Sequence, residues 1–343
     1  MQKGDDYVIM GLMCGTDLRE EKPDRSPEIY IIDIIRCVAC LMIFFYHCNT
    51  ILPGEYRWVT FFGEDMGNQL FFMISGFALF PSIRGRELKQ LPGWYFRRLI
   101  RILPMLAFFY LLSFLTGFYS FKDPAQVFTV FVYPTLYWFV TAILVFYLLL
   151  FLFLKINSRI IQWLIMAGIF ALWCLRADRM EAYYFAGALS MMTGALLRRA
   201  SEELQERKGI ERLWAAAFVF FFAAYVFVKH YKFSGIRADT LVLVAAGILV
   251  ILTGESALLL GYLKNESLSG FFEGREAFLR IIKKTGRLAL PVYMVQCFNA
   301  GIIGYTIGNR VIFPLSFLVN LIVIWALAII TDLLFGRISG HFK

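Results

Sequence analysis

The first long apolar stretch of the chain carries an aspartate, an arginine and a histidine whose positions differ by 3 and 11. Asp33, Arg36 and His47 stand among residues 31–50, most of which are apolar. In a helix that turns about 100° per residue, the step from Arg36 to His47 ends only about 20° past three full turns, so both side chains share one face, roughly 16 Å apart along the axis. Asp33 lies one turn before Arg36 and can pair with it. The spacing therefore predicts a charged pair on one turn of a helix and a histidine farther along the same face.

His47 is the residue in this stretch that is best suited to moving a proton. Placing an ionisable side chain at the centre of a membrane helix costs about 2.5–3.5 kcal/mol, so such a residue is a functional candidate by default. Because hydrocarbon disfavours the charged form, the imidazole is expected to be neutral and able to accept a proton. It can act as a general base toward a hydroxyl or as a station in a proton relay, and the sequence leaves both open. For Asp33, a purely structural pairing with Arg36 carries equal weight.

Two further groups of residues are candidates for binding or support. Arg98 and Arg101 are three residues apart and lie at neighbouring positions on a helix. Arginine forks bind phosphate through two parallel hydrogen bonds, but arginines also anchor helices at lipid headgroups, and the residues alone favour neither reading. Ser75 precedes Gly76, a pair that favours close helix packing over a direct role for the serine. No G-x-S-x-G motif occurs, so a serine hydrolase is not expected.

Membrane helices are the elements that must position these residues. Of the 343 residues, 59% are hydrophobic and 17% are charged, whereas soluble chains average about half and about a quarter. A membrane helix needs about 20 apolar residues. The predicted fold is all-α, a polytopic transmembrane helix bundle of about ten spans. The candidate spans are 29–51, 67–82, 102–121, 134–154, 159–175, 182–198, 213–229, 239–262, 288–308 and 311–334.

The distribution of positive charge predicts the orientation of this bundle. With the N-terminal segment taken as cytoplasmic, alternate loops place 25 Lys and Arg residues inside and 8 outside. This asymmetry puts both termini in the cytoplasm. The predicted parts are a cytoplasmic N-terminal tail over 1–28, a transmembrane domain over 29–335 and a short cytoplasmic C-terminal tail over 336–343. The net charge of +9 is explained by the inner loops, so no nucleic-acid partner is expected.

Two other features favour a structural role. The predicted inner loop before the ninth span contains Lys283, Lys284 and Arg287. For this loop, contact with anionic lipid headgroups is favoured over binding of a cytosolic polyanion such as a nucleotide or coenzyme. Cys37 and Cys40 form a C-x-x-C motif, but no second pair completes a metal set. They are expected to be packed thiols, and no metal site is predicted.

In combination, these motifs resemble the acyltransferase-3 family of integral-membrane acyltransferases. The likeness covers about residues 29–335, and the matching pieces stand in the family's order. They are Arg36 followed by ten residues and His47, as in R-x10-H; residues 71–77, as in F-F-x-x-S-G-F; and Arg98-x-x-Arg101 with Pro104, as in R-x-x-R followed by proline. Weaker matches are Trp138-Phe139 and residues 290–295.

Two positions depart from the family pattern. Gln69 stands where the family often has aspartate, and Gln296 stands where it often has histidine. Those family positions vary, so activity is not excluded, but a second catalytic histidine is excluded at Gln296.

The resemblance implies a reaction and its partners. Such proteins move an acyl group, usually acetyl, from acyl-coenzyme A to a sugar hydroxyl, often in a cell-surface polysaccharide. The implied partners are acyl-coenzyme A as donor substrate, a carbohydrate acceptor, membrane lipid and polysaccharide-assembly proteins, with no bound cofactor. The implied location is the plasma membrane, which the chain would cross many times.

The resemblance also implies roles for individual residues. Arg36, Arg98 and Arg101 would bind the donor. His47 would be the general base or, less readily, a transient acyl carrier. The residues expected to support them are Asp33 and Ser75.

Two other classes of function fit the same residues. A buried Asp–Arg–His set also serves proton-coupled transporters or export partners for a glycan or small solute. Against transport, the sequence has no repeated halves and no paired broken helices. A structural subunit of a glycan-assembly complex is the third reading, in which substitutions at Arg98 or His47 would be tolerated.

Overall fold

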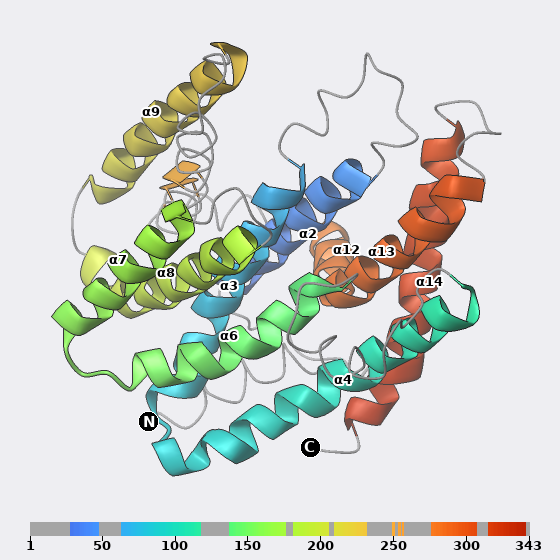
Figure 1. The fold of residues 1–343 in the computed structure, drawn as a ribbon, viewed down its shortest axis with the longest axis horizontal. Helices are drawn as coiled ribbons and strands as arrows, with labels where there is room; N and C mark the ends of the chain where they lie inside the picture. Colours follow the sequence, from blue (N-terminus) through green and yellow to red (C-terminus); the bar gives the residue numbers. More distant parts are fainter. Residues whose placement is uncertain are drawn as a thin grey trace.

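The chain folds into packed helices. A computed structural model describes residues 28–47, 63–117, 137–175, 181–205, 209–231, 276–306 and 315–340, together with 249–250, 253–254 and 256. Every regular element within these residues is helical, which confirms the predicted all-α class (Figure 1). The elements are α2 (Glu28–His47), α3 (Gly63–Arg84), η3 (Leu88–Gln90), α4 (Leu91–Leu115), α6 (Trp138–Leu154), α7 (Arg159–Leu175), α8 (Glu181–Gln205), α9 (Ile210–Tyr231), α12 (Glu276–Arg287), α13 (Ala289–Thr306) and α14 (Leu315–Gly340).

Helices α3 and α8 form a close contact, which small residues make possible. Gly76 of α3 packs against the carbonyl of Met191, and Gly194 of α8 packs against the carbonyl of Met73. A Cβ at either glycine would collide with backbone, so neither position accepts a side chain unless a helix moves. The predicted packing role of the Ser75-Gly76 pair is therefore confirmed for Gly76, and Ser75 lies beside it, partly buried.

Helix α2 runs beside α12 and the start of α13, and thiol contacts fix their register. The thiol of Cys37 donates to the carbonyl oxygen of Ile282 at 3.5 Å, and the thiol of Cys40 donates to that of Ala289 at 3.9 Å. From the first contact to the second, the residue number increases in both segments, so α2 and the α12–α13 segment run in the same direction. Both cysteines are free and packed, as the sequence predicts.

An aromatic layer, consisting of Phe71, Phe72, Phe139 and Tyr293, joins α3, α6 and α13. The ring centroid of Phe139 lies 4.7 Å from that of Phe72 and 4.8 Å from that of Tyr293. The centroid of the Phe71 ring lies 5.7 Å from that of the Phe139 ring. These tilted rings are the packing that aromatic side chains prefer, and they hold three helices that are far apart in the sequence around one apolar centre.

Within the residues that the structure describes, two helical stretches are long and apolar enough to cross a membrane, Leu88–Leu115 and Leu318–Phe335. The described helices overlap nine of the ten predicted spans, while almost all of the eighth, 239–262, lies outside the described residues. The ten-span count, the cytoplasmic termini and the tail over 1–28 stay predictions. Helix α14 continues to Gly340, so it extends through most of the predicted tail over 336–343.

Helix α12 differs from the sequence prediction, which assigned these residues to an inner loop. Its sequence, EAFLRIIKKTGR, places apolar and charged residues on opposite sides of a helix. A search for long apolar stretches overlooks such a helix because charged residues interrupt every apolar run.

Candidate functional site

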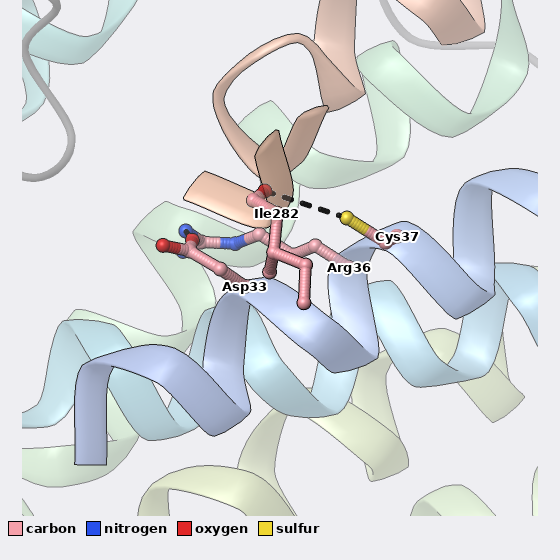
Figure 2. A network of polar contacts seen from close by, with 4 residues as sticks. All are labelled: Asp33, Arg36, Cys37 and Ile282. Carbon is pink, nitrogen blue, oxygen red and sulfur yellow. Dashed lines mark hydrogen bonds and ion pairs between the residues drawn. The ribbon is translucent and has the colours of Figure 1, made fainter. Parts of the chain in front are cut away.

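The charged pair predicted on α2 is present. Arg36 donates from Nη1 to Oδ1 of Asp33 at 3.0 Å. Figure 2 shows the two side chains together, with Cys37 beside them pointing to the carbonyl of Ile282 on α12. Asp33 is only 2% exposed, and no described group hydrogen-bonds its other oxygen, Oδ2. A buried carboxylate with a free oxygen needs positive charge nearby.

Helix α12 brings that positive charge. Lys283 and Arg287 both lie within electrostatic range of the Asp33 carboxylate. Gly286 makes this approach possible, because a Cβ there would stand 2.9 Å from Oδ1 of Asp33. The sequence favoured lipid headgroups as the partner of these basic residues. The structure adds a second interaction, because Lys283 and Arg287 also lie within electrostatic range of Asp33, and their contact with lipid headgroups stays a prediction.

Arg98 is held in place by a tryptophan and a serine. Its Nη1 donates to the carbonyl oxygen of Trp94 at 3.1 Å, and its Nη2 donates to Oγ of Ser82 at 3.2 Å. The guanidinium carbon lies 3.8 Å from the centroid of the Trp94 ring, which is a close cation–π contact. A guanidinium has five N–H donors, so these two bonds fix its plane without using its full binding capacity.

The three arginines predicted to bind the donor have one tyrosine as a shared electrostatic neighbour. Arg36, Arg98 and Arg101 all lie within electrostatic range of the hydroxyl of Tyr147 on α6. They come from α2 and α4, so the convergence is a property of the fold. We name Arg36, Arg98, Arg101, Lys283 and Arg287 the basic cluster.

Among the residues that the structure describes, acidic charge within range of this cluster comes from two helices. Asp332 on α14 interacts electrostatically with Arg101 and Arg287, and Asp33 on α2 also interacts with Arg287. Within the described part of the chain, five cations thus stand against two carboxylates. The site keeps a positive excess, which suits a polyanionic ligand.

Sequence reasoning missed Tyr147, Lys283, Arg287 and Asp332 as site residues. Tyr147 had a weak signal, since it is one of few polar side chains in the strongly apolar helix α6. The others lie on segments whose position depends on tertiary packing, and a pattern along one segment carries no information about its neighbours.

His47 stands apart from the basic cluster. It is the last residue of α2, and it lies roughly 16 Å beyond Arg36 along the helix axis. Its Nε2 lies 4.0 Å from Sγ of Cys297 on α13. The predicted site residues therefore form two groups, with the arginines at one level of α2 and the histidine at another.

The two positions that depart from the family pattern are both buried. Oε1 of Gln69 accepts a 2.7 Å hydrogen bond from Oγ of Ser190, which ties α3 to α8. Gln296 is 1% exposed, and no described group hydrogen-bonds either polar atom of its side chain. Among the residues that the structure describes, no group of three or more His, Cys, Asp or Glu side chains is placed to hold a metal ion.

Comparison with known proteins assigns the chain to a family. Residues 29–331 match the acyltransferase-3 family, described as an acyltransferase domain. No curated protein and no solved structure matches the chain. The match covers every residue of the basic cluster, and it includes His47 and nearly all of the described helices. The chain therefore belongs to the acyltransferase-3 family and is a membrane acyltransferase.

Proposed function

We propose that this protein moves an acyl group, most simply acetyl, from acyl-coenzyme A to a hydroxyl of a cell-surface glycan. The supporting observation is the arrangement along α2. Arg36 stands in the basic cluster, and His47 ends the same helix roughly 16 Å farther on. Acyl-coenzyme A carries phosphates at one end and a thioester at the other. The phosphates would meet the cations of the basic cluster, and the thioester would meet the proton acceptor, His47.

The basic cluster is the proposed site for the phosphates of coenzyme A. Arginine forks bind phosphate oxygens through paired hydrogen bonds, and Arg98 is already oriented by Trp94 and Ser82. From there an extended pantetheine arm would follow α2 toward His47. The positive excess at the cluster also draws a polyanion to this end of the protein.

His47 is the proposed general base. Its imidazole accepts the proton of the acceptor hydroxyl, and the hydroxyl oxygen attacks the thioester carbonyl carbon. The carbon–sulfur bond then breaks, the ester is formed, and the coenzyme A thiolate takes the proton from the imidazolium. The products are an O-acyl glycan and free coenzyme A thiol. No cofactor is required, because the donor carries the activated acyl group.

The setting that we propose is the plasma membrane, crossed by multiple helices with both termini in the cytoplasm. Acyl-coenzyme A would then enter from the cytosol, and the acceptor glycan would reach the His47 end from the other side. Polysaccharide-assembly proteins are the proposed protein partners, since they would present the acceptor.

Replacing His47 tests the proposal directly. Cells that express the wild-type chain or His47→Ala are compared by NMR for O-acetyl groups on surface glycans, with protein abundance measured in parallel. We expect the O-acetyl signal to fall to background in His47→Ala at normal abundance. Unchanged acetylation at normal abundance would refute the role of His47. Solute uptake driven by a pH gradient, without release of coenzyme A thiol, would instead identify a transporter.

A further inference from the structure

Gln296 is a buried amide that no described residue hydrogen-bonds. Its side chain is 1% exposed, and neither Nε2 nor Oε1 has a hydrogen-bond partner among the described residues. Leaving a buried donor and a buried acceptor unmet is unfavourable for folding, and a specific reason is expected where it occurs.

Other buried glutamines in the described residues are satisfied. Nε2 of Gln162 donates to the carbonyl oxygens of Phe153 at 3.2 Å and Ile156 at 3.0 Å. Oε1 of Gln69 accepts from Ser190. This fold can therefore pair a buried amide, and the amide of Gln296 stands out by comparison.

The register of α2 and α13 places Gln296 at the level of His47. Cys40 contacts Ala289, and the two helices run in the same direction. Seven residues make about two turns of a helix. Seven residues beyond Cys40 is His47, and seven beyond Ala289 is Gln296, so both lie on the facing sides, about two turns farther along.

A second contact confirms this register. Cys297, the residue after Gln296, places its Sγ 4.0 Å from Nε2 of His47. The unpaired amide and the imidazole therefore lie at one level of the α2–α13 interface.

The surroundings strengthen any hydrogen bond that the amide makes. Tyr293, one turn before Gln296, belongs to the aromatic layer and packs on Phe139. The neighbouring Val295 and Cys297 are buried as well. In such a low-dielectric environment a fixed N–H donor stabilises developing negative charge far better than it would in water.

We infer that Gln296 is a catalytic residue that donates its side-chain N–H to the carbonyl oxygen of the acyl thioester. This inference rests on the proposed function. As the acceptor oxygen attacks the carbonyl carbon and His47 takes the proton, the carbonyl oxygen gains negative charge. The amide N–H stabilises that charge until the carbon–sulfur bond breaks and the charge leaves with the coenzyme A thiolate. The Oε1 atom remains available to accept a hydrogen bond from a hydroxyl of the acceptor.

The test compares Gln296→Leu with Gln162→Leu in the purified full chain. Release of coenzyme A thiol from acetyl-coenzyme A is measured with de-O-acylated surface polysaccharide of the source cells as acceptor, alongside thermal unfolding in detergent. We expect Gln296→Leu to lower kcat about 100-fold with the KM for acetyl-coenzyme A within about twofold. Its Tm should stay the same or rise, because no hydrogen bond is lost and an unmet amide is removed.

Gln162→Leu is the matched control, and it should behave in the opposite way. It deprives two carbonyl oxygens of their donor, so its Tm should fall, while kcat per folded molecule stays near the wild-type value. Gln296→His supplies a ring N–H in place of the amide and is expected to keep about a tenth or more of the wild-type kcat.

The outcomes separate the inference from the proposed function. If the wild-type chain releases no coenzyme A thiol, the proposed function is wrong. If the wild-type chain is active and Gln296→Leu keeps more than half of its kcat, the role of Gln296 alone is wrong. A loss of kcat in Gln296→Leu that only follows a loss of Tm would equally overturn it.

Discussion

The guanidinium carbon of Arg98 lies 3.8 Å from the centroid of the Trp94 ring, and the guanidinium also donates to the backbone carbonyl of the same residue. One tryptophan thus fixes both the position and the plane of an arginine in the basic cluster. An ammonium group in this place can neither stack in the same way nor present two parallel donors.

Arg98→Lys should therefore impair donor binding although it keeps the charge. Loss of one charge-assisted hydrogen-bond pair should raise the KM for acyl-coenzyme A about 10- to 100-fold, with a smaller effect on kcat. Steady-state kinetics on the purified protein checks this. Lys89→Gln, which removes an exposed cation paired with Glu87 at 2.7 Å, is the control and should leave KM unchanged. An equal rise in both variants would mean that only general positive charge matters.

Arg287→Gln distinguishes donor binding from lipid contact on α12. Nε of Arg287 is buried without a hydrogen-bond partner among the described residues, and the side chain lies within electrostatic range of Asp33 and Asp332. We expect the KM for acyl-coenzyme A to rise about tenfold or more.

Lys284→Gln is the matched control on the same helix, because Lys284 is exposed and the change in charge is identical. Its KM should stay within about twofold of wild type, since exposed charges interact weakly. If both variants shift membrane association and neither shifts KM, the lipid-headgroup interpretation of this segment is right.

Sequence patterns predict what lies along one helix, and they fail where separate helices meet. Arg36 and His47 share α2, so helical spacing alone orders them, and the Asp33–Arg36 pair follows from the same spacing. Tyr147 and Arg287 join the site only because α6 and α12 pack beside α2. The approach of α12 depends on Gly286, whose missing side chain leaves room for Asp33. Nothing in the spacing of apolar residues signals that contact.

Asp33→Asn should destabilise the protein. The carboxylate is the buried counter-charge of Arg36 and interacts with Lys283 and Arg287. Removing one partner of a buried ion pair typically costs about 3–5 kcal/mol, because the remaining charge is left unpaired. Thermal unfolding and protein abundance in the membrane measure the effect. Glu87→Gln, which breaks an exposed pair, should change stability little. Equal stability of the two variants would show that the Asp33–Arg36 pair behaves as a surface salt bridge.

Gly76→Ala should disrupt the packing of α3 on α8. The added methyl group would meet the carbonyl of Met191, and overpacking of this kind typically costs about 1–3 kcal/mol. Gly168→Ala is the control, because that glycine lies in α7 with nothing within 4 Å of the added Cβ. There the substitution should be neutral or stabilise the helix by up to about 1 kcal/mol. Comparable Tm values for both variants would contradict the close α3–α8 contact.

Substitutions at Cys297 test whether its thiol reacts or only packs against His47. The Sγ–Nε2 distance of 4.0 Å is that of a weak thiol contact, so Cys297→Ala should keep most of the wild-type kcat. Cys297→Ser introduces a hydroxyl that hydrogen-bonds the imidazole more strongly, competes with the acceptor and should lower kcat about tenfold, which corresponds to roughly one hydrogen bond. Turnover of acetyl-coenzyme A by each purified variant gives the comparison. If Cys297→Ala is as inactive as His47→Ala at normal stability, the thiol carries the acyl group and direct transfer to the acceptor is wrong.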